Sequence, residues 1–132
     1  MIKRTREILF RGKRTDNGEW VEGYYTLYAN NRGVHPCILT GTEQGCVIPV
    51  FVIPETVGQF TGLTDRKGKK IFEDDIAMFD GSDIVYIGFV DGVYRLFNKN
   101  GYYTVSVHNH YAYIEIIGNI HDNPELLERE AK

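Results

Sequence analysis

His108 and His110 are the residues of this sequence whose type and spacing come closest to a metal site. If their segment is a strand, alternation places both imidazoles on one face, with His121 or His35 available as a third ligand. Neither a paired-cysteine motif nor a His-Glu-x-x-His pattern accompanies them. We therefore favour polar residues of a loop or strand end, and we predict no metal and no cofactor.

The acidic run Glu73-Asp74-Asp75, with Asp80 and Asp83 after it, has the carboxylates for a divalent cation or for an acid–base pair. Neighbouring residues of a strand point to opposite faces, so the three adjacent carboxylates cannot converge on one ion. The run also lacks the spacing of a calcium-binding loop. We interpret it as a solvated turn in which Asp75 accepts hydrogen bonds from backbone amides.

Nucleophilic catalysis has no sequence motif in this chain. There is no Gly-x-Ser-x-Gly elbow and no glycine-rich phosphate loop, and the only serines are Ser82 and Ser106. No positive feature therefore predicts an enzyme. A small hydrolase-like enzyme stays as the third functional alternative, without a substrate.

Two sets of residues have the chemistry to bind a partner. The basic N-terminal stretch can contact phosphates, and tyrosines of the C-terminal half can stack on bases or anchor a protein. The acidic C-terminal half would repel nucleic acid, and strand packing is the alternative role for the tyrosines. The candidate binding residues are Arg4, Arg6, Arg11, Lys13, Arg14, Tyr102, Tyr103, Tyr111 and Tyr113.

The length of 132 residues suits one domain, and the 13% of aromatic residues with 14 glycines favours β structure. The net charge of −3 does not by itself imply a nucleic-acid or membrane partner. Its distribution is uneven, because residues 1–14 are strongly basic whereas residues 71–92 are acidic without a single Lys or Arg. These two charge poles predict either solvated strand faces or head-to-tail association of subunits.

No apolar run approaches the ~20 residues of a membrane helix, and no apolar segment follows the basic N-terminus. We therefore expect a cytoplasmic protein with no membrane partner. Cys37 and Cys46 would not face each other in a hairpin centred on Glu43, so we expect both thiols to be reduced.

Period-two apolar patterns and turn residues define the expected elements. Pro36 and Pro49 lie inside two of the strands and predict edge or broken strands. Residues 20–28 carry large apolar groups on both faces, so we expect this strand to be covered on both sides. Strands are expected at residues 6–14, 20–28, 34–40, 46–53, 71–79, 83–90, 93–97, 102–107 and 112–120. Turns are expected at 16–18, 80–82, 91–92 and 98–101, with a longer polar turn at 61–70. Helical structure is limited to one turn at 54–56 and a two-turn C-terminal helix that Asn123 caps.

Five runs, at residues 6–14, 16–24, 54–63, 71–76 and 117–127, together cover nearly the whole chain in order. These runs resemble the YopX-like family of phage and prophage proteins. The resemblance implies a mainly β fold and a phage or prophage origin, and the family has no established activity. Asp74 departs from the family, which usually has Gly there. If Gly serves a positive φ, Asp tolerates it at some cost; if Gly serves close approach of the backbone to another group, this chain has lost that contact.

The predicted fold is all-β within a single YopX-like domain, 1–132. It comprises an N-terminal hairpin lobe (1–62) packed on a small SH3-like barrel (63–120), and a short helical tail (121–132). The predicted function is a non-enzymatic binding or assembly module that forms homo-oligomers or binds another phage or host protein. A nucleic-acid-binding accessory protein is the second alternative.

Overall fold

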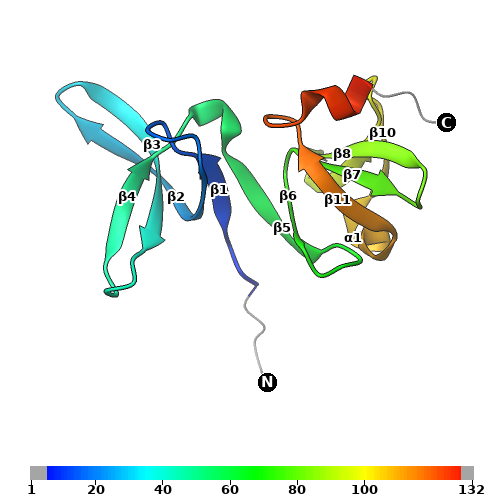
Figure 1. Cartoon of the computed structure of the whole chain (residues 1–132), viewed down its shortest axis with the longest axis horizontal. Coiled ribbons are helices and arrows are strands. Elements are labelled where there is room, and N and C mark those ends of the chain that lie inside the picture. Colours follow the sequence, from blue (N-terminus) through cyan, green and yellow to red (C-terminus); the bar gives the residue numbers. More distant parts are fainter. Residues whose placement is uncertain (1–5, 129–132) are drawn as a thin grey trace. The chain divides into compact units, whose positions relative to one another are not determined.

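The computed structural model describes residues 6–128, and these residues are mainly β, in antiparallel sheets, as predicted. The chain divides into two compact units, residues 1–60 and 61–132. Strand β5 (Gly58–Thr64) belongs to both, because Gly58 and Gln59 pair with β1 whereas its later residues lie in the second unit. Figure 1 shows the elements in sequence colours.

The first unit is a four-stranded meander in the order β4-β3-β2-β1. An Arg14–Val52 bridge and a Thr15 N–H bond to Phe51 O link the end of β4 back to the end of β1, so the meander curls on itself. Gly12 allows this closure, since a Cβ there would lie 3.0 Å from Val52 Cβ. Its elements are β1 (Phe10–Lys13), β2 (Trp20–Asn30), β3 (Gly33–Gly41), β4 (Val47–Phe51) and the 3₁₀ turn η1 (Pro54–Thr56).

The second unit is built on a five-stranded sheet in the order β10-β9-β8-β7-β11. Strands β8 and β9 are joined by Asp91-Gly92, whose φ values of 52° and 79° are those of a type I′ hairpin turn. Its elements are β6 (Lys70–Phe72), β7 (Asp75–Phe79), β8 (Asp83–Val90), β9 (Val93–Phe97), β10 (Tyr103–Ser106), α1 (Val107–His110), η2 (Tyr111–Tyr113), β11 (Ile114–Asn119) and η3 (Pro124–Glu128).

One side of this sheet forms the larger core of the molecule. Its members alternate along β7, β8 and β11, as expected for strands with one buried face. The buried cluster comprises Ile71, Ala77, Val85, Ile87, Leu96, Val107, Ile114 and Ile116. The pairing gives an antiparallel sheet, and the closed SH3-like barrel stays a prediction.

Several predicted elements differ from the observed ones. The first strand begins at Phe10 rather than at residue 6, and the predicted turn at 61–70 begins later because β5 continues to Thr64. The single strand predicted at 71–79 is broken into β6 and β7, because Asp74 has φ 70°, which extended backbone does not allow. Asp74 thus adopts the positive φ that was one of the two explanations considered for a glycine at this position.

The C-terminal predictions also need correction. The last strand starts at Ile114, because η2 takes up the two residues before it, and the tail is a 3₁₀ helix rather than an α-helix. Asn123, expected to cap that helix, directs its Oδ1 back to the backbone N–H of Asn119 at 3.2 Å. This bond ties the tail to the end of β11.

The edge prediction from proline is right for one strand and wrong for the other. β4, with Pro49, is an edge strand, whereas β3, with Pro36, is paired on both sides. The N–H of Val52, one residue beyond β4, donates to the Pro36 carbonyl, so the nitrogen of Pro36 also faces that side rather than β2. The missing amide of Pro36 therefore removes no hydrogen bond from the β2–β3 ladder.

The strongest correction concerns β2, which was expected to be covered on both faces. Tyr24 is 65% exposed on one face, and Leu27 is 57% exposed on the other. Among the described residues of the first unit, the buried apolar ones are Cys37, Ile38, Val50, Val52 and Phe60. The apolar pattern predicted the strand correctly, but within the first unit it leaves large side chains exposed on both faces.

Candidate functional site

The two histidines lie outside the strands, so they do not form the strand pair that a metal site would have required. They lie in the single turn of α1, where His110 Nδ1 is 2.9 Å from Ser106 O and its ring meets Phe79 edge-on at 5.8 Å. His108 is exposed on the same turn. Within residues 6–128, no three His, Cys, Asp or Glu side chains gather closely enough to hold a metal ion.

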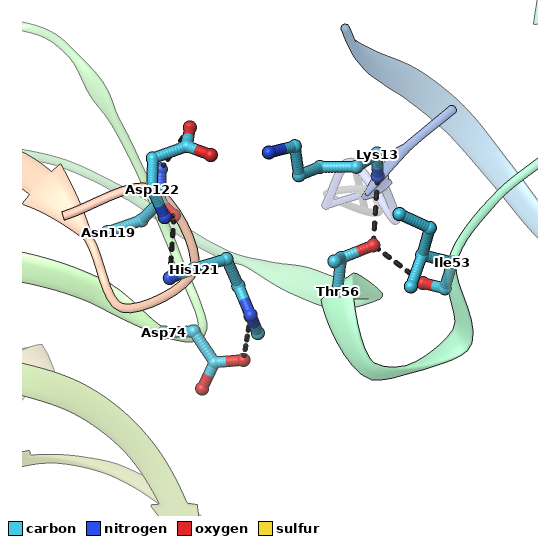
Figure 2. A network of polar contacts seen from close by, with 7 residues as sticks. All are labelled: Lys13, Ile53, Thr56, Asp74, Asn119, His121 and Asp122. Atoms are coloured by element: carbon cyan, nitrogen blue, oxygen red, sulfur yellow. Dashed lines mark hydrogen bonds and ion pairs between the residues drawn. The ribbon is translucent and has the colours of Figure 1, made fainter. Parts of the chain in front are cut away.

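The acidic run forms the turn between β6 and β7. Asp75 is buried, and its Oδ2 accepts the backbone N–H of Phe72 at 2.8 Å, which confirms its predicted structural role. Asp74 turns outward from the strand, and its Oδ2 lies 3.0 Å from His121 Nε2 (Figure 2). Asn119 Oδ1 in turn accepts the backbone N–H groups of His121 and Asp122. This cluster fastens the C-terminal segment to the β6–β7 turn.

The predicted cations of the first unit are largely engaged within the chain. The Arg11 guanidinium lies 4.7 Å and the Lys13 ammonium 5.9 Å from the centre of the Trp20 ring, and Arg14 pairs with Asp16 at 2.8 Å. Arg6 is exposed, and Arg4 lies outside the described residues. Nucleic-acid binding by this set stays a prediction.

The backbone around Lys13 is fixed by η1. The Lys13 N–H donates to Thr56 Oγ1 at 2.9 Å, and that hydroxyl donates to Ile53 O at 2.6 Å (Figure 2). Thr56 is 6% exposed, so its hydroxyl satisfies backbone groups that burial would otherwise leave unpaired. The end of β1 is therefore held rigidly.

The four predicted tyrosines are exposed but lie in two separate places. Tyr102 and Tyr103 flank the start of β10, whereas Tyr111 and Tyr113 lie in η2. Tyr103 meets the Phe97 ring at 5.7 Å. The structure therefore does not gather the four into one site.

Sequence reasoning missed an aromatic row on the outer face of the second sheet. Tyr86 stacks on Phe97 at 5.2 Å, Phe97 meets Tyr103, and the Arg95 guanidinium lies 5.4 Å from the Tyr103 ring. Gly88 makes room for this row, because a Cβ there would come within 2.4 Å of Phe97 Cε1. The pairs Tyr86–Phe97 and Phe97–Tyr103 are directly opposite in register, a signal available only once the pairing is known.

It also missed a surface of the first unit that consists of one sheet face. We call it the outer aromatic face and define it as Tyr24, Tyr28, His35, Val47 and Phe51, which the register places on the same side of β2, β3 and β4. Phe51 lies 5.9 Å from Tyr28 and stacks on His35 at 5.3 Å. The opposite face is also apolar and exposed, at Leu27, Val34 and Ile48.

Comparison with known proteins agrees with this architecture. The family model described as YopX protein matches residues 9–128. The chain belongs to the YopX family. A search of curated proteins finds no match.

Two solved structures share the fold. Protein EF1440 from Enterococcus faecalis is 22% identical, with a TM-score of 0.55, and the match covers 93% of this chain and 99% of that one. Protein yopX from Bacillus subtilis is also 22% identical, with a TM-score of 0.54 over 96% of this chain and 99% of its own. In the described part of the chain, no helix has the length and apolar character needed to cross a membrane.

Proposed function

We propose that this YopX family member is a phage- or prophage-derived, non-enzymatic assembly module that binds further copies of itself through the sheet of its first unit. The phage origin rests on the family resemblance. The self-association rests on one observation: the sheet formed by β2, β3 and β4 exposes large apolar side chains on both faces and is almost free of charge.

The absence of charge is a property of the sequence itself. Residues 23–31, 33–42 and 44–54 contain no Asp, Glu, Lys or Arg. Monomeric proteins seldom leave large contiguous apolar patches in water, and charged residues are depleted at the cores of interfaces. A partner with strong charge would find no counter-charge here, whereas a second copy presents the same neutral, apolar surface.

The outer edge of β4 offers few free backbone groups to a second copy, so we expect association through the faces of the sheet. The bonds Thr42 N to Cys46 O and Val52 N to Pro36 O fix the alternation of the β3–β4 ladder. In that alternation the nitrogen of Pro49 faces the outer edge, where it offers no donor. Phe51 O, on the same edge, already accepts the N–H of Thr15. Copies would therefore meet face to face through the outer aromatic face.

Molecular mass in solution tests this proposal. We expect the wild-type chain to sediment well above its monomer mass of 15.2 kDa. Tyr24→Lys and Val47→Lys, at positions 65% and 64% exposed, should lower the mass to that of a monomer. Tyr102→Lys is the matched control, since this tyrosine is 71% exposed but lies in the second unit.

The dependence of the molecular mass on salt concentration distinguishes association through the apolar surface from association through the two charge poles. Screening weakens contacts between charges, but it does not weaken apolar burial. Assemblies should therefore persist from low to high salt. A wild-type chain that is monomeric at high concentration, or Lys variants that assemble as before, would contradict the proposal.

A further inference from the structure

The second unit contains a cavity of 670 Å³ at the end of its sheet where β8 begins and β9 ends. Its floor is apolar and consists of Phe79, Ile84, Val85, Val105 and Leu127. Val85 belongs to the buried cluster, and Phe79 and Val105 pack against it, so the cavity opens onto the core. The volume is that of a ligand pocket, for which about 300–1,000 Å³ is usual.

The rim of the cavity is polar and is held in shape by its own hydrogen bonds. Asn98 Oδ1 accepts the backbone N–H groups of Asn100 and Tyr102 at 2.9 and 3.1 Å. Thr104 Oγ1 donates to Leu96 O at 3.1 Å. The opening is therefore formed before any ligand arrives, as in most binding pockets.

The rim also carries two opposite charges. Asp83 and Lys99 both line the cavity and are exposed, and neither forms an ion pair within residues 6–128. A charged group entering the cavity would be attracted by one and repelled by the other, and its desolvation over an apolar floor would be costly. The occupant that fits is uncharged and apolar, with polar groups that remain at the rim.

Within residues 6–128, no strand pairs with the outer edge of β10, which lies beside the cavity. β10 is the last strand of its sheet, and Thr104 and Val105 of this strand line the cavity. Asn98 N donates to Tyr102 O, so the next pair, Phe97 and Tyr103, is a non-hydrogen-bonded pair of the ladder. The N–H and C=O of Tyr103 consequently point away from β9, toward the open edge.

We propose that the cavity and the outer edge of β10 together bind an extended, uncharged, apolar segment of another protein. The segment adds to β10 as a further strand through the backbone of Tyr103, and one aliphatic side chain enters the cavity. All the residues involved belong to the second unit. The proposal therefore does not depend on self-association through the first unit.

Fluorescence anisotropy with the full-length chain tests this inference. The probe is the fluorescein-labelled peptide Thr-Val-Thr-Leu-Thr-Val-amide, and the matched control peptide has Pro in place of the central Leu, which removes both a strand donor and the aliphatic anchor. We expect the control peptide to bind at least about tenfold more weakly.

Two variants locate the binding on the protein. Tyr103→Pro removes the outward N–H at an edge position where Pro is tolerated, and Val105→Phe fills the cavity; each should weaken binding about tenfold. Ile48→Lys, in the first unit, should leave the peptide affinity unchanged. This result would show that the peptide does not bind to the exposed sheet of the first unit. Equal binding of both peptides, no binding of either, or full binding by a folded Val105→Phe variant would overturn the proposal.

Discussion

The carboxylate of Asp65 accepts a hydrogen bond from the backbone N–H of Ile116 at 2.9 Å, across 51 residues of sequence. Its other oxygen accepts the N–H groups of Lys67 and Lys69, both at 2.9 Å. Asp65 is 6% exposed, so one buried side chain organises the β5–β6 turn and attaches it to β11. The side chain is therefore part of the structure of the second unit rather than of its surface.

Asp65→Asn should destabilise the chain by about 2–3 kcal/mol at neutral pH, because an amide presents one acceptor oxygen and leaves buried N–H groups unpaired. Urea unfolding at pH 7 measures this difference. Lys67→Ala is the control, since it removes a side chain from the same turn but keeps the backbone N–H. A loss below about 0.5 kcal/mol for Asp65→Asn would show that water replaces these bonds.

Acid should remove part of the stability that Asp65 provides. Burial alone would raise the pKa of Asp65, but the three backbone amides and the nearby Lys69 together bring it below the ordinary value. A carboxylate with a lowered folded pKa stabilises the fold above its unfolded pKa of about 3.9, and this stabilisation disappears as the pH falls through the folded pKa. Between pH 5 and pH 2, wild type should therefore lose more stability than Asp65→Asn; parallel curves would argue against this assignment.

Asp74 has a strained positive φ, and its carboxylate contacts His121. Substitutions can separate the contributions of the backbone and of the side chain to stability. Asp74→Ala should cost about 1–2 kcal/mol, because Ala tolerates φ 70° poorly and cannot pair with His121. Asp74→Gly should recover most of this loss because Gly adopts positive φ freely. Denaturant midpoints measure both, and a Gly variant as unstable as the Ala variant would assign the loss to the side chain alone.

Gly88 should not accept a side chain. A Cβ at this position would meet Phe97 Cε1 at 2.4 Å, so Gly88→Ala must displace the ring from the aromatic row. We expect a destabilisation of about 1–3 kcal/mol and a changed near-ultraviolet circular dichroism spectrum. Gly41→Ala is the matched control, because nothing lies within 4 Å of its added Cβ. Equal stability of the two variants would contradict the packing described.

The two cysteines should differ in reactivity. Cys37 is fully buried, and burial raises the pKa of its thiol, whereas Cys46 is exposed. Iodoacetamide should therefore label Cys46 in the folded chain and both thiols after denaturation. Mass spectrometry of the native protein should show one adduct, which Cys46→Ser removes. Rapid labelling of Cys37 would show that the first unit opens frequently.

Local chemistry made the turns and most strands predictable. Asp91-Gly92 and Asn17-Gly18 mark reversals of the chain because their residues accept positive φ, and both turns form where expected. The break at Asp74 was not predicted, since residues 71–79 were expected to form one strand; the family resemblance raised only the possibility of a positive φ there. The helical turn Val107–His110 was missed because four residues with a single apolar side chain carry no periodic signal that separates a helical turn from a loop.

The candidate sites were much less predictable, for a physical reason. The apolar pattern of β2 identifies a strand but does not say whether another layer covers Tyr24 or Leu27. The cavity is lined from β7, β8, β10, η3 and the β9–β10 turn, and no local signal connects these segments. Arg14 was predicted as a binding residue from the basic charge of its segment, and the number of charges does not reveal that Arg14 pairs with Asp16 in the folded chain.

The pairing of β7 with β11 has a consequence for the order of events during synthesis. Strands β1 to β4 are complete once Phe51 has been made, whereas β7 waits for Ile114–Asn119 before its second neighbour exists. Domains that emerge first from the ribosome generally fold first. If copies associate through the first-unit sheet as proposed, nascent chains would present this sheet to one another while the second unit is still incomplete, and assembly would begin on polysomes.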